Sequence, residues 1–325
     1  MIVSRTPLRI TIGGGGTDLP SFYEKHGGFV LSMAINKYIY ITFKPDDFEP
    51  LLKLRYSQIE IVDHVSQLKH HRAKEALIMH GIENGCEINS CADIPSNTGL
   101  GSSGTFLVGL LNAIREHRRL DHGPHVLAEE ACNIEINRLG EPVGKQDQFI
   151  AAYGGLKILR IQPDGQVNVG CPDMSYSDLQ HFLTNVHVYY LNIKRDASDI
   201  LSDQKSLKGN SEDILKTVKQ FGYESLIMLE NGQFDDYGYQ LDEYWQLKKK
   251  LSNKISIGAV DKLYERLKDN FAVLGGKIIG AGGGGFFMLY VQRHHQQVEE
   301  YMATQGYKRL HYNLDDRGST ICGNF

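Results

Sequence analysis

A glycine-rich turn lies between a segment typical of a β-strand and a segment typical of a helix. The turn is Gly99–Gly104, the apolar segment Ile88–Ala92 precedes it, and the helical pattern begins at Thr105. Glycines ahead of a helix N-terminus let several backbone N–H groups converge on one anion, and the helix dipole adds partial positive charge. Ser102 and Ser103 add hydroxyls that can cap the helix or reach a phosphate or a magnesium ion. The turn therefore predicts a phosphate-binding loop.

A second glycine run, Gly280–Gly285, has the same G-x-G-x-x-G spacing. The spacing alone is weak evidence, and a plain tight turn between strands is the alternative. Four successive glycines allow a backbone to approach a ligand closely, because no side chain intervenes. We therefore expect Gly282 and Gly283 to lie near a bound molecule.

Three familiar chemistries of glycine-rich loops do not fit. A Walker A loop is absent, because the Gly-Lys pairs at 144–145 and 276–277 are followed by Gln146 and Ile278. A dinucleotide-binding domain needs an acidic residue at the end of its second strand, but Asp121 lies in a polar turn between predicted helices. No segment matches the catalytic loop or the D-F-G motif of protein kinases.

Composition excludes several classes of protein. A net charge of −4 among 325 residues gives no electrostatic reason to bind nucleic acid, and no apolar run is long enough to span a bilayer. The five cysteines contain no C-x-x-C pair, and the histidines contain no H-E-x-x-H motif. The first seven residues lack the layout of a secretory signal. We therefore expect a cytoplasmic protein that has no disulfide framework and no histidine-based metal site.

Hydrophobic periodicity predicts an α+β protein in which helices and strands are partly segregated. The sequence becomes more polar after Pro172, and this change in composition predicts two domains, 1–178 and 179–325. The expected strands are 29–43, 51–55, 58–62, 86–92, 155–161, 167–170, 186–193, 277–279, 286–291 and 308–311. The expected helices are 72–80, 103–117, 125–139, 146–152, 211–230, 235–251, 258–270 and 295–305.

Three motifs resemble those of the GHMP kinases, the superfamily of galactokinase, homoserine kinase, mevalonate kinase and phosphomevalonate kinase. Pro95–Gly104 resembles the signature P-x-x-x-G-L-G-S-S-A, with glycine in place of the final alanine, a change that we expect to leave the loop intact. Pro7–Asp18 resembles the N-terminal substrate motif, and Gly280–Gly285 resembles the C-terminal glycine motif that closes over the site. The motifs stand in the family's order and cover nearly the whole chain.

This resemblance implies a two-domain GHMP kinase fold, in which an N-terminal ribosomal-protein-S5-like α/β domain binds ATP and precedes a ferredoxin-like α+β domain. It implies that Ser103 and Glu135 hold Mg²⁺. The residues that it assigns to ATP are Pro95, Gly99, Leu100, Gly101, Ser102, Ser103 and Gly104.

Within the superfamily, the spacing resembles that of sugar kinases. As in galactokinases, Arg9 lies nine residues before Asp18, and Glu135 lies twelve residues before Asp147. Gly15 and Gly16 replace the Glu-His of galactokinases, which argues against galactose. The glycine run and the segment around Asp147 are similar to those of the heptose phosphate kinases. That similarity implies phosphorylation of the anomeric O1 of D-glycero-D-manno-heptose 7-phosphate, on the way to GDP-heptose.

Each predicted role has a plainer alternative. Asp147 accepts or orients the proton of the acceptor hydroxyl, or it only complements a helix dipole. Arg9 stabilises developing negative charge, or it is a surface arginine of a strand. Asp18, with Gly15, Gly16 and Thr17, binds sugar hydroxyls, or it is a turn residue.

Glu135 lies on a predicted helix face with small and apolar neighbours, where a solvated carboxylate is unusual. It is a magnesium ligand, or it pairs in the core with an N–H group or an arginine, for which Arg138 is a candidate. A substrate phosphate needs its own anion site. Lys194 and Arg195, at the end of a predicted strand, are the first choice, with Arg72 and Lys74 as alternatives.

Other functions stay open at this point. The alternatives are a kinase for L-fucose, galactose or a uronic acid, a non-catalytic sensor of sugar and ATP, and a dinucleotide oxidoreductase. We expect a small-molecule sugar phosphate as partner, with neither nucleic acid nor membrane, and the sequence leaves a homodimer open.

Overall fold

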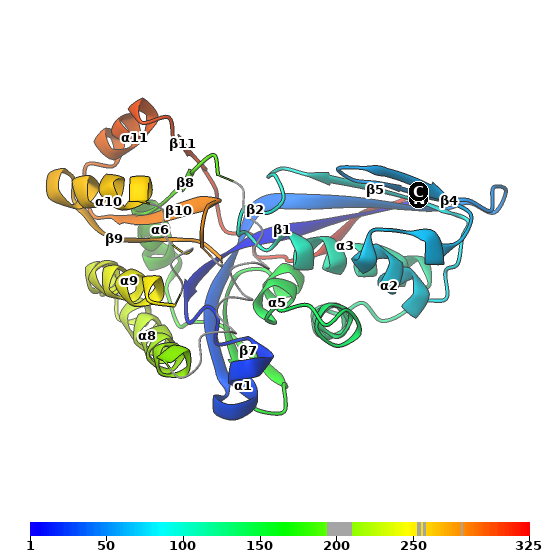
Figure 1. The fold of residues 1–325 in the computed structure, drawn as a ribbon, viewed down its shortest axis with the longest axis horizontal. Helices are drawn as coiled ribbons and strands as arrows, with labels where there is room; N and C mark the ends of the chain where they lie inside the picture. Colours follow the sequence, from blue (N-terminus) through cyan, green and yellow to red (C-terminus); the bar gives the residue numbers. More distant parts are fainter. Residues whose placement is uncertain (194–209, 252–254, 256–257, 281) are drawn as a thin grey trace.

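The computed structural model describes residues 1–193, 210–251, 255, 258–280 and 282–325. In these residues the strands form an eight-stranded and a four-stranded sheet. Helices pack on both sheets and do not alternate strictly with the strands (Figure 1). The predicted α+β class is confirmed.

The first sheet is built around two long apolar strands that pair antiparallel, β1 (Ile2–Gly13) and β2 (Gly28–Pro45). The first half of β2 pairs with β6 and the second half with β5, so that one strand joins two parts of the sheet. The path of strands is β12-β1-β2-β5-β3-β4, and β7 pairs with β6. The other strands are β3 (Leu52–Arg55), β4 (Ile59–Val62), β5 (Cys86–Ala92), β6 (Leu156–Ile161), β7 (Val167–Gly170) and β12 (Thr320–Asn324).

Helix α3 (Ser102–His117) begins at the glycine turn and packs on β1 and β2. Its N-cap, Gly101, has φ 80°, a left-handed conformation that suits glycine. The predicted helix over 125–139 is divided, because α4 ends at Cys132 and a π-helical turn, Asn133–Arg138, follows it. The other helices here are α1 (Pro20–His26), α2 (His71–Met79), α4 (Pro124–Cys132), α5 (Gln146–Tyr153) and α6 (Tyr176–Asn185).

The second sheet has the order β11-β8-β10-β9, and all its pairs are antiparallel. In Figure 1, α8 and α9 lie below this sheet, and α10 and α11 lie above it. The strands are β8 (Val186–Tyr190), β9 (Val273–Ile278), β10 (Phe286–Val291) and β11 (Lys308–Arg309). The helices are α8 (Asn210–Glu230), α9 (Phe234–Lys249), α10 (Gly258–Asn270) and α11 (His295–Thr304).

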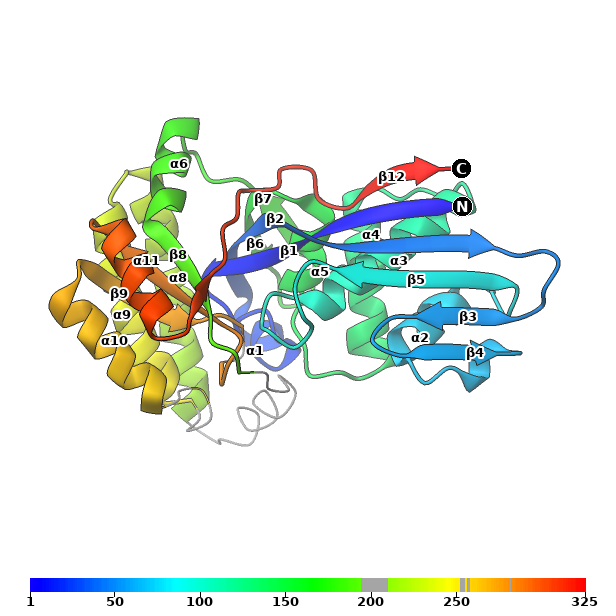
Figure 2. The ribbon, with the colours of Figure 1, turned by 90° about the horizontal axis from the view of Figure 1, so that it is seen from above.

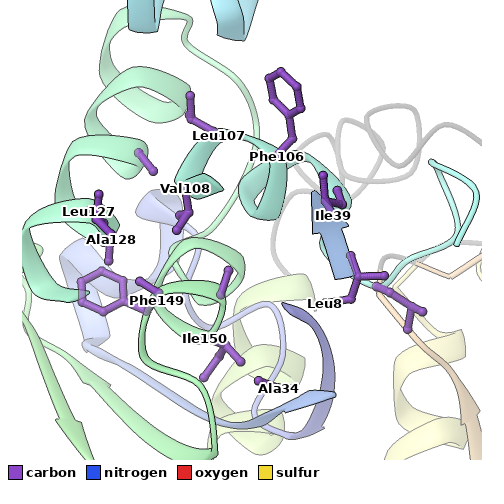
Figure 3. Close-up of a cluster of buried hydrophobic side chains, with 14 of the residues drawn as sticks. Leu8, Ala34, Ile39, Phe106, Leu107, Val108, Leu127, Ala128, Phe149 and Ile150 are labelled. Carbon is purple, nitrogen blue, oxygen red and sulfur yellow. The ribbon is translucent and has the colours of Figure 1, made fainter. Parts of the chain in front are cut away.

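Two connections hold the halves together. The apolar core between the first sheet and helices α3, α4 and α5 (Figure 3) continues to Tyr237 on α9 and Met288 on β10. The last strand, β12, pairs with β1, and both termini lie at one end of the first sheet (Figure 2). The division at 178 and 179 stays our proposal, and the return of β12 means that the last residues lie in the first sheet.

Three helices and strands were not predicted, α1, α6 and β12, and neither was the short 3-10 helix Val65–Gln67. The first turn of α6 has a signal that could have revealed it, because Ser175 accepts a hydrogen bond from the Asp178 N–H at 3.1 Å, and S-x-x-D is a capping pattern. β12 is only five residues long and pairs with a strand more than 300 residues away. None of the described helices combines the length and the apolar character needed to cross a membrane.

Candidate active site

One pocket brings together residues from both sheets. Its wall consists of the glycine turn, the start of α5 and the end of β1, with α9 and β9 completing it. The predicted site residues that line this pocket are Arg9, Gly15, Gly16, Asp18, Gly99, Gly101, Ser102, Ser103 and Asp147.

Arg9 and Asp147 form an ion pair in the pocket wall. The Arg9 Nε donates to Asp147 Oδ1 at 2.7 Å, and a second guanidinium nitrogen donates to the Gly99 carbonyl. The side chain of Arg9 is 5% exposed and that of Asp147 is 23% exposed, so the carboxylate is open to the pocket while the cation is buried behind it. The backbone N–H of Arg9 donates to the Leu100 carbonyl at 3.0 Å. Arg9 therefore fixes Asp147 and the glycine turn relative to each other.

The glycine turn allows this close approach. A Cβ added to Gly101 would lie 3.1 Å from Asp147 Cγ and 3.2 Å from Arg9 Cγ. A Cβ on Gly104 would lie 2.9 Å from Asp147 Cβ, which is closer than real side chains come. The missing side chains at these two positions therefore let α3 and α5 meet at the site.

The two glycine runs are in contact with each other. A Cβ on Gly99 would lie 2.5 Å from the Ile279 carbonyl oxygen, and one on Gly285 would lie 2.1 Å from that of Thr98. Gly280 lines the pocket, whereas Gly282 and Gly283 do not, and the Gly283 N–H donates to the Ile255 carbonyl at 2.8 Å. The second run therefore packs on the first.

Asp18 is a buried carboxylate that faces the pocket. It accepts hydrogen bonds from the backbone N–H groups of Gly16 and Gln146, both at 3.1 Å. Burial raises the pKa of Asp18, and the nearby Asp147 charge acts in the same direction. A Cβ on Gly144 would lie only 2.0 Å from Asp18 Oδ2, so glycine is required there.

Thr17 does not line the pocket. Its hydroxyl bonds to the carbonyls of Gly14 and Phe29, at 2.8 and 2.7 Å, and its side chain is buried. It therefore holds the glycine loop against β2. Leu100 is a core residue, and the Pro95 carbonyl accepts a hydrogen bond from Thr98 at 2.9 Å inside the turn.

Glu135 is fully buried and does not line the pocket. Arg72 Nε donates to it at 2.6 Å, Gln148 donates to its other oxygen, and Arg72 also pairs with Glu141. An arginine partner in the core was the alternative to metal binding, but Arg138 as that partner is wrong, because Arg138 pairs with Glu75.

Four residues were candidates for a substrate anion site, and two of them, Arg72 and Lys74, are in the described part of the chain. Lys194 and Arg195 fall outside the described residues. Arg72 is engaged with two carboxylates, and Lys74 Nζ donates to the Ser66 carbonyl at 2.6 Å. Neither Arg72 nor Lys74 lines the pocket.

Two lysines that the sequence analysis missed lie in the pocket. Lys248 on α9 and Lys277 on β9 are 8% and 2% exposed, and both line its wall beside Tyr244. Burial lowers the pKa of Lys248 to about 8 and that of Lys277 well below its usual value. Lysines are usually solvated, so the sequence did not single these two out. Their burial follows from the packing of α9 on β9.

The buried charge of Lys248 predicts a pH-dependent stability. It faces Arg9 and Lys277 as cations, Asp18 as an anion, and the Tyr244 ring. Between pH 8 and 10.5 the unfolded lysine holds a proton that the folded one releases, so this group makes the fold more stable as pH rises. We therefore compare the free energies of unfolding of the wild type and of Lys248→Met, measured by urea unfolding. From pH 8 to 10.5 the value for the wild type should rise by up to about 3 kcal/mol relative to that for the variant. A constant difference between the two proteins would contradict this.

Comparisons with known proteins agree with the geometry. Residues 60–155 match the family model of the GHMP kinases N terminal domain. The chain is 28% identical over 294 residues to the D-glycero-alpha-D-manno-heptose 7-phosphate kinase of Campylobacter jejuni, with 86% of each chain covered. It is 25% identical over 323 residues to L-fucokinase/L-fucose-1-P guanylyltransferase of Bacteroides fragilis, covering 87% of this chain and 34% of that protein.

The fold is similar to that of solved GHMP kinases along its whole length. The crystal structure of a D-glycero-D-manno-heptose 1-phosphate kinase from Bacteroides thetaiotaomicron superposes with a TM-score of 0.82, at 22% identity and with 100% of each chain covered. The predicted GHMP kinase fold is confirmed.

Proposed function

We propose that this chain, which belongs to the GHMP kinase superfamily of phosphotransferases, transfers the γ-phosphate of ATP to the anomeric O1 of D-glycero-D-manno-heptose 7-phosphate. The observation that carries the proposal is the Arg9–Asp147 ion pair, which lies in one pocket with the glycine turn and with Asp18. A nucleotide site and a hydroxyl-orienting carboxylate would then share one cavity.

The glycine turn and the N-terminus of α3 would hold the phosphates of ATP. The hydroxyls of Ser102 and Ser103 line the pocket and make no hydrogen bond to any described residue, so both are available to a ligand. Backbone N–H groups at a helix N-terminus favour phosphate oxygens through their dipoles. Pro95, Leu100 and Gly104 would support this loop from behind.

Asp147 would hold the attacking hydroxyl and accept its proton as the phosphoryl group moves. Phosphoryl transfer passes through a loose transition state, so that orientation of the hydroxyl contributes as much as proton abstraction. Arg9 fixes the carboxylate and supplies positive charge near the oxygens where negative charge develops. Asp18, with Gly15 and Gly16, would accept hydrogen bonds from sugar hydroxyls.

The substrate assignment is supported by the heptose 7-phosphate kinase that is 28% identical. A kinase for L-fucose is the second candidate, supported by the relative at 25% identity. Gly15 and Gly16 argue against galactose. The reaction would be a step in the synthesis of GDP-heptose, which is used for surface polysaccharide. It would take place in the cytoplasm.

Magnesium would be held by Ser103 and Glu135, and it would neutralise charge on the ATP phosphates. Ser103 fits this role as it stands. Glu135 can take part only if Arg72 releases it, and Arg72 has a second carboxylate, Glu141, to retain it. A doubly charged metal ion in place of the singly charged guanidinium would add one positive charge, which the phosphates of ATP would offset.

Replacing Glu135 with glutamine separates the two roles of this residue. We expect the Mg²⁺ concentration at half-maximal rate to rise about tenfold, because a neutral amide is a weaker ligand for a hard cation. The measurement is initial rate against free Mg²⁺ at saturating ATP. Arg72→Met is the control, since it removes the ion pair but leaves the carboxylate. An unchanged Mg²⁺ dependence in Glu135→Gln would assign the residue to packing alone.

The test of the proposed function is a screen for ADP release over free sugars and sugar phosphates. It includes heptose 7-phosphate, heptose 1-phosphate, L-fucose, galactose and glucuronic acid. We expect the highest kcat/KM with heptose 7-phosphate. Binding of ATP and sugar without turnover would favour a non-catalytic sensor, and turnover of L-fucose alone would favour the second candidate.

A further inference from the structure

The pocket contains more buried positive charge than its own carboxylates balance. Asp147 is paired with Arg9, and Asp18 is held by backbone N–H groups. Lys248 and Lys277 lie in the same wall, and no carboxylate in the described part of the chain lies within ion-pair distance of either. A buried cation is costly unless a ligand or a partner compensates it.

Each lysine has donors left over for a ligand. Lys248 Nζ donates to the Gly280 carbonyl at 2.7 Å, and Lys277 Nζ donates to the Ile12 carbonyl at 2.9 Å. An ammonium group has three N–H donors, so two remain on each. The hydroxyl of Tyr244 makes no hydrogen bond to a described residue, and its ring lies 4.7 Å from Lys277 Nζ and 5.9 Å from Lys248 Nζ.

These three groups lie on the acceptor side of the pocket. A Cβ on Gly15 would lie 3.8 Å from Tyr244 Oη, so the ring is next to the loop proposed to bind the sugar. The charge of Asp18 acts on both Lys248 and Tyr244, which places the three together. The anion site for ATP is built separately, at the N-terminus of α3.

We propose that Lys248 and Lys277, with the hydroxyl of Tyr244, bind the phosphate group that the acceptor already carries. This rests on the proposed function, because it takes the acceptor to be a sugar phosphate. Both lysines line the same cavity as Asp18, and a bound phosphate favours their protonated forms, whose two charges match those of a phosphate dianion. The pair then selects phosphorylated sugars over free sugars.

The test compares Lys248→Met and Lys277→Met with the wild type on two acceptors, heptose 7-phosphate and unphosphorylated heptose. Methionine fills a similar volume, and the Ile12 carbonyl keeps the hydrogen bond from Tyr237 at 3.2 Å. We expect KM for heptose 7-phosphate to rise about 10- to 100-fold in each variant, as for the loss of one charged hydrogen-bond donor. We expect KM for ATP and KM for unphosphorylated heptose to change less than threefold.

Lys250→Met is the matched control, because Lys250 is exposed at the end of the same helix. It should leave both KM values unchanged. Equal losses on the two acceptors in Lys248→Met and Lys277→Met would show a structural role and overturn the proposal. A rise confined to KM for ATP would assign the lysines to the nucleotide and overturn it too.

A binding measurement separates this proposal from the proposed function. Calorimetry of inorganic phosphate is carried out with the nucleotide site filled by a non-hydrolysable ATP analogue. Weaker phosphate binding in both lysine variants supports the site even if heptose 7-phosphate is not a substrate. Unchanged phosphate binding overturns the site even if heptose 7-phosphate is turned over.

Discussion

Asp147→Asn should lower kcat about 10³-fold while leaving the affinity for ATP near that of the wild type. The amide has almost the shape of the carboxylate, but it cannot take up the hydroxyl proton, and general base catalysis contributes on this scale. Arg9 then lacks its charged partner, so the geometry of the pair loosens as well. The measurements are kcat with heptose 7-phosphate and equilibrium binding of ATP.

Asp236→Asn is the control for this change. Asp236 lies in the first turn of α9 and is exposed, so the same chemical replacement there should leave kcat unchanged. If Asp147→Asn kept more than a tenth of the wild-type kcat, Asp147 would have no part in the chemical step. A parallel loss of ATP binding would instead show a collapsed pocket.

Gly144→Ala should lower kcat/KM for the acceptor about 100-fold. The added methyl would lie 2.0 Å from Asp18 Oδ2 and 2.3 Å from Asp18 Cγ, so the carboxylate must leave its position. Asp18 then loses its hydrogen bond from the Gln146 N–H, which fixes it in the pocket. Because a displacement of about 1 Å at a reacting centre costs on the order of 10²-fold, the loss should be large.

The matched control is Gly258→Ala at the start of α10, where an added methyl meets no atom within 4 Å. Alanine should raise the free energy of unfolding there by about 0.5 kcal/mol, with activity unchanged. Thermal unfolding and steady-state rates on both variants check this. Normal acceptor kinetics in Gly144→Ala would mean that Asp18 does not bind the sugar.

Local patterns were enough to predict the glycine turn and the helix that follows it. Gly101 and the start of α3 follow from a strand, a glycine turn and a helix in that order, and the structure has all three. Arg9, Asp18 and Asp147 came from spacing within family motifs, and they share one pocket. Each of these predictions depends mainly on residues that lie close together in the sequence.

The two buried lysines of the pocket could not be predicted in the same way. Lys248 lies near the end of an amphipathic helix where three lysines follow one another, and only packing buries one of them against the pocket. Lys277 lies two residues after Gly275, where an added Cβ would lie 2.0 Å from the Gly238 carbonyl oxygen, so this glycine allows the tight packing of β9 on α9. Both facts depend on contacts between distant segments.

The π-helical turn at Asn133–Arg138 is a further case of this kind. The helical spacing of apolar residues continues through this turn, so the sequence predicts one unbroken helix. Nothing in the order of residues 133–138 indicates the change from an α-helix to a π-helix. The turn places Glu135 against Arg72 on α2, 63 residues away in the chain. The partner of a buried carboxylate is decided by tertiary packing, which the sequence does not display.

Phosphorylation of the anomeric O1 is tested most directly by ³¹P NMR of the product formed from ATP and D-glycero-D-manno-heptose 7-phosphate. We expect a second phosphorus signal that is coupled to the anomeric proton, in equal amount to the ADP released. With Asp147→Asn this signal should form about 10³-fold more slowly. A product phosphorylated at another carbon, or ADP release without any new sugar phosphorus, would contradict it.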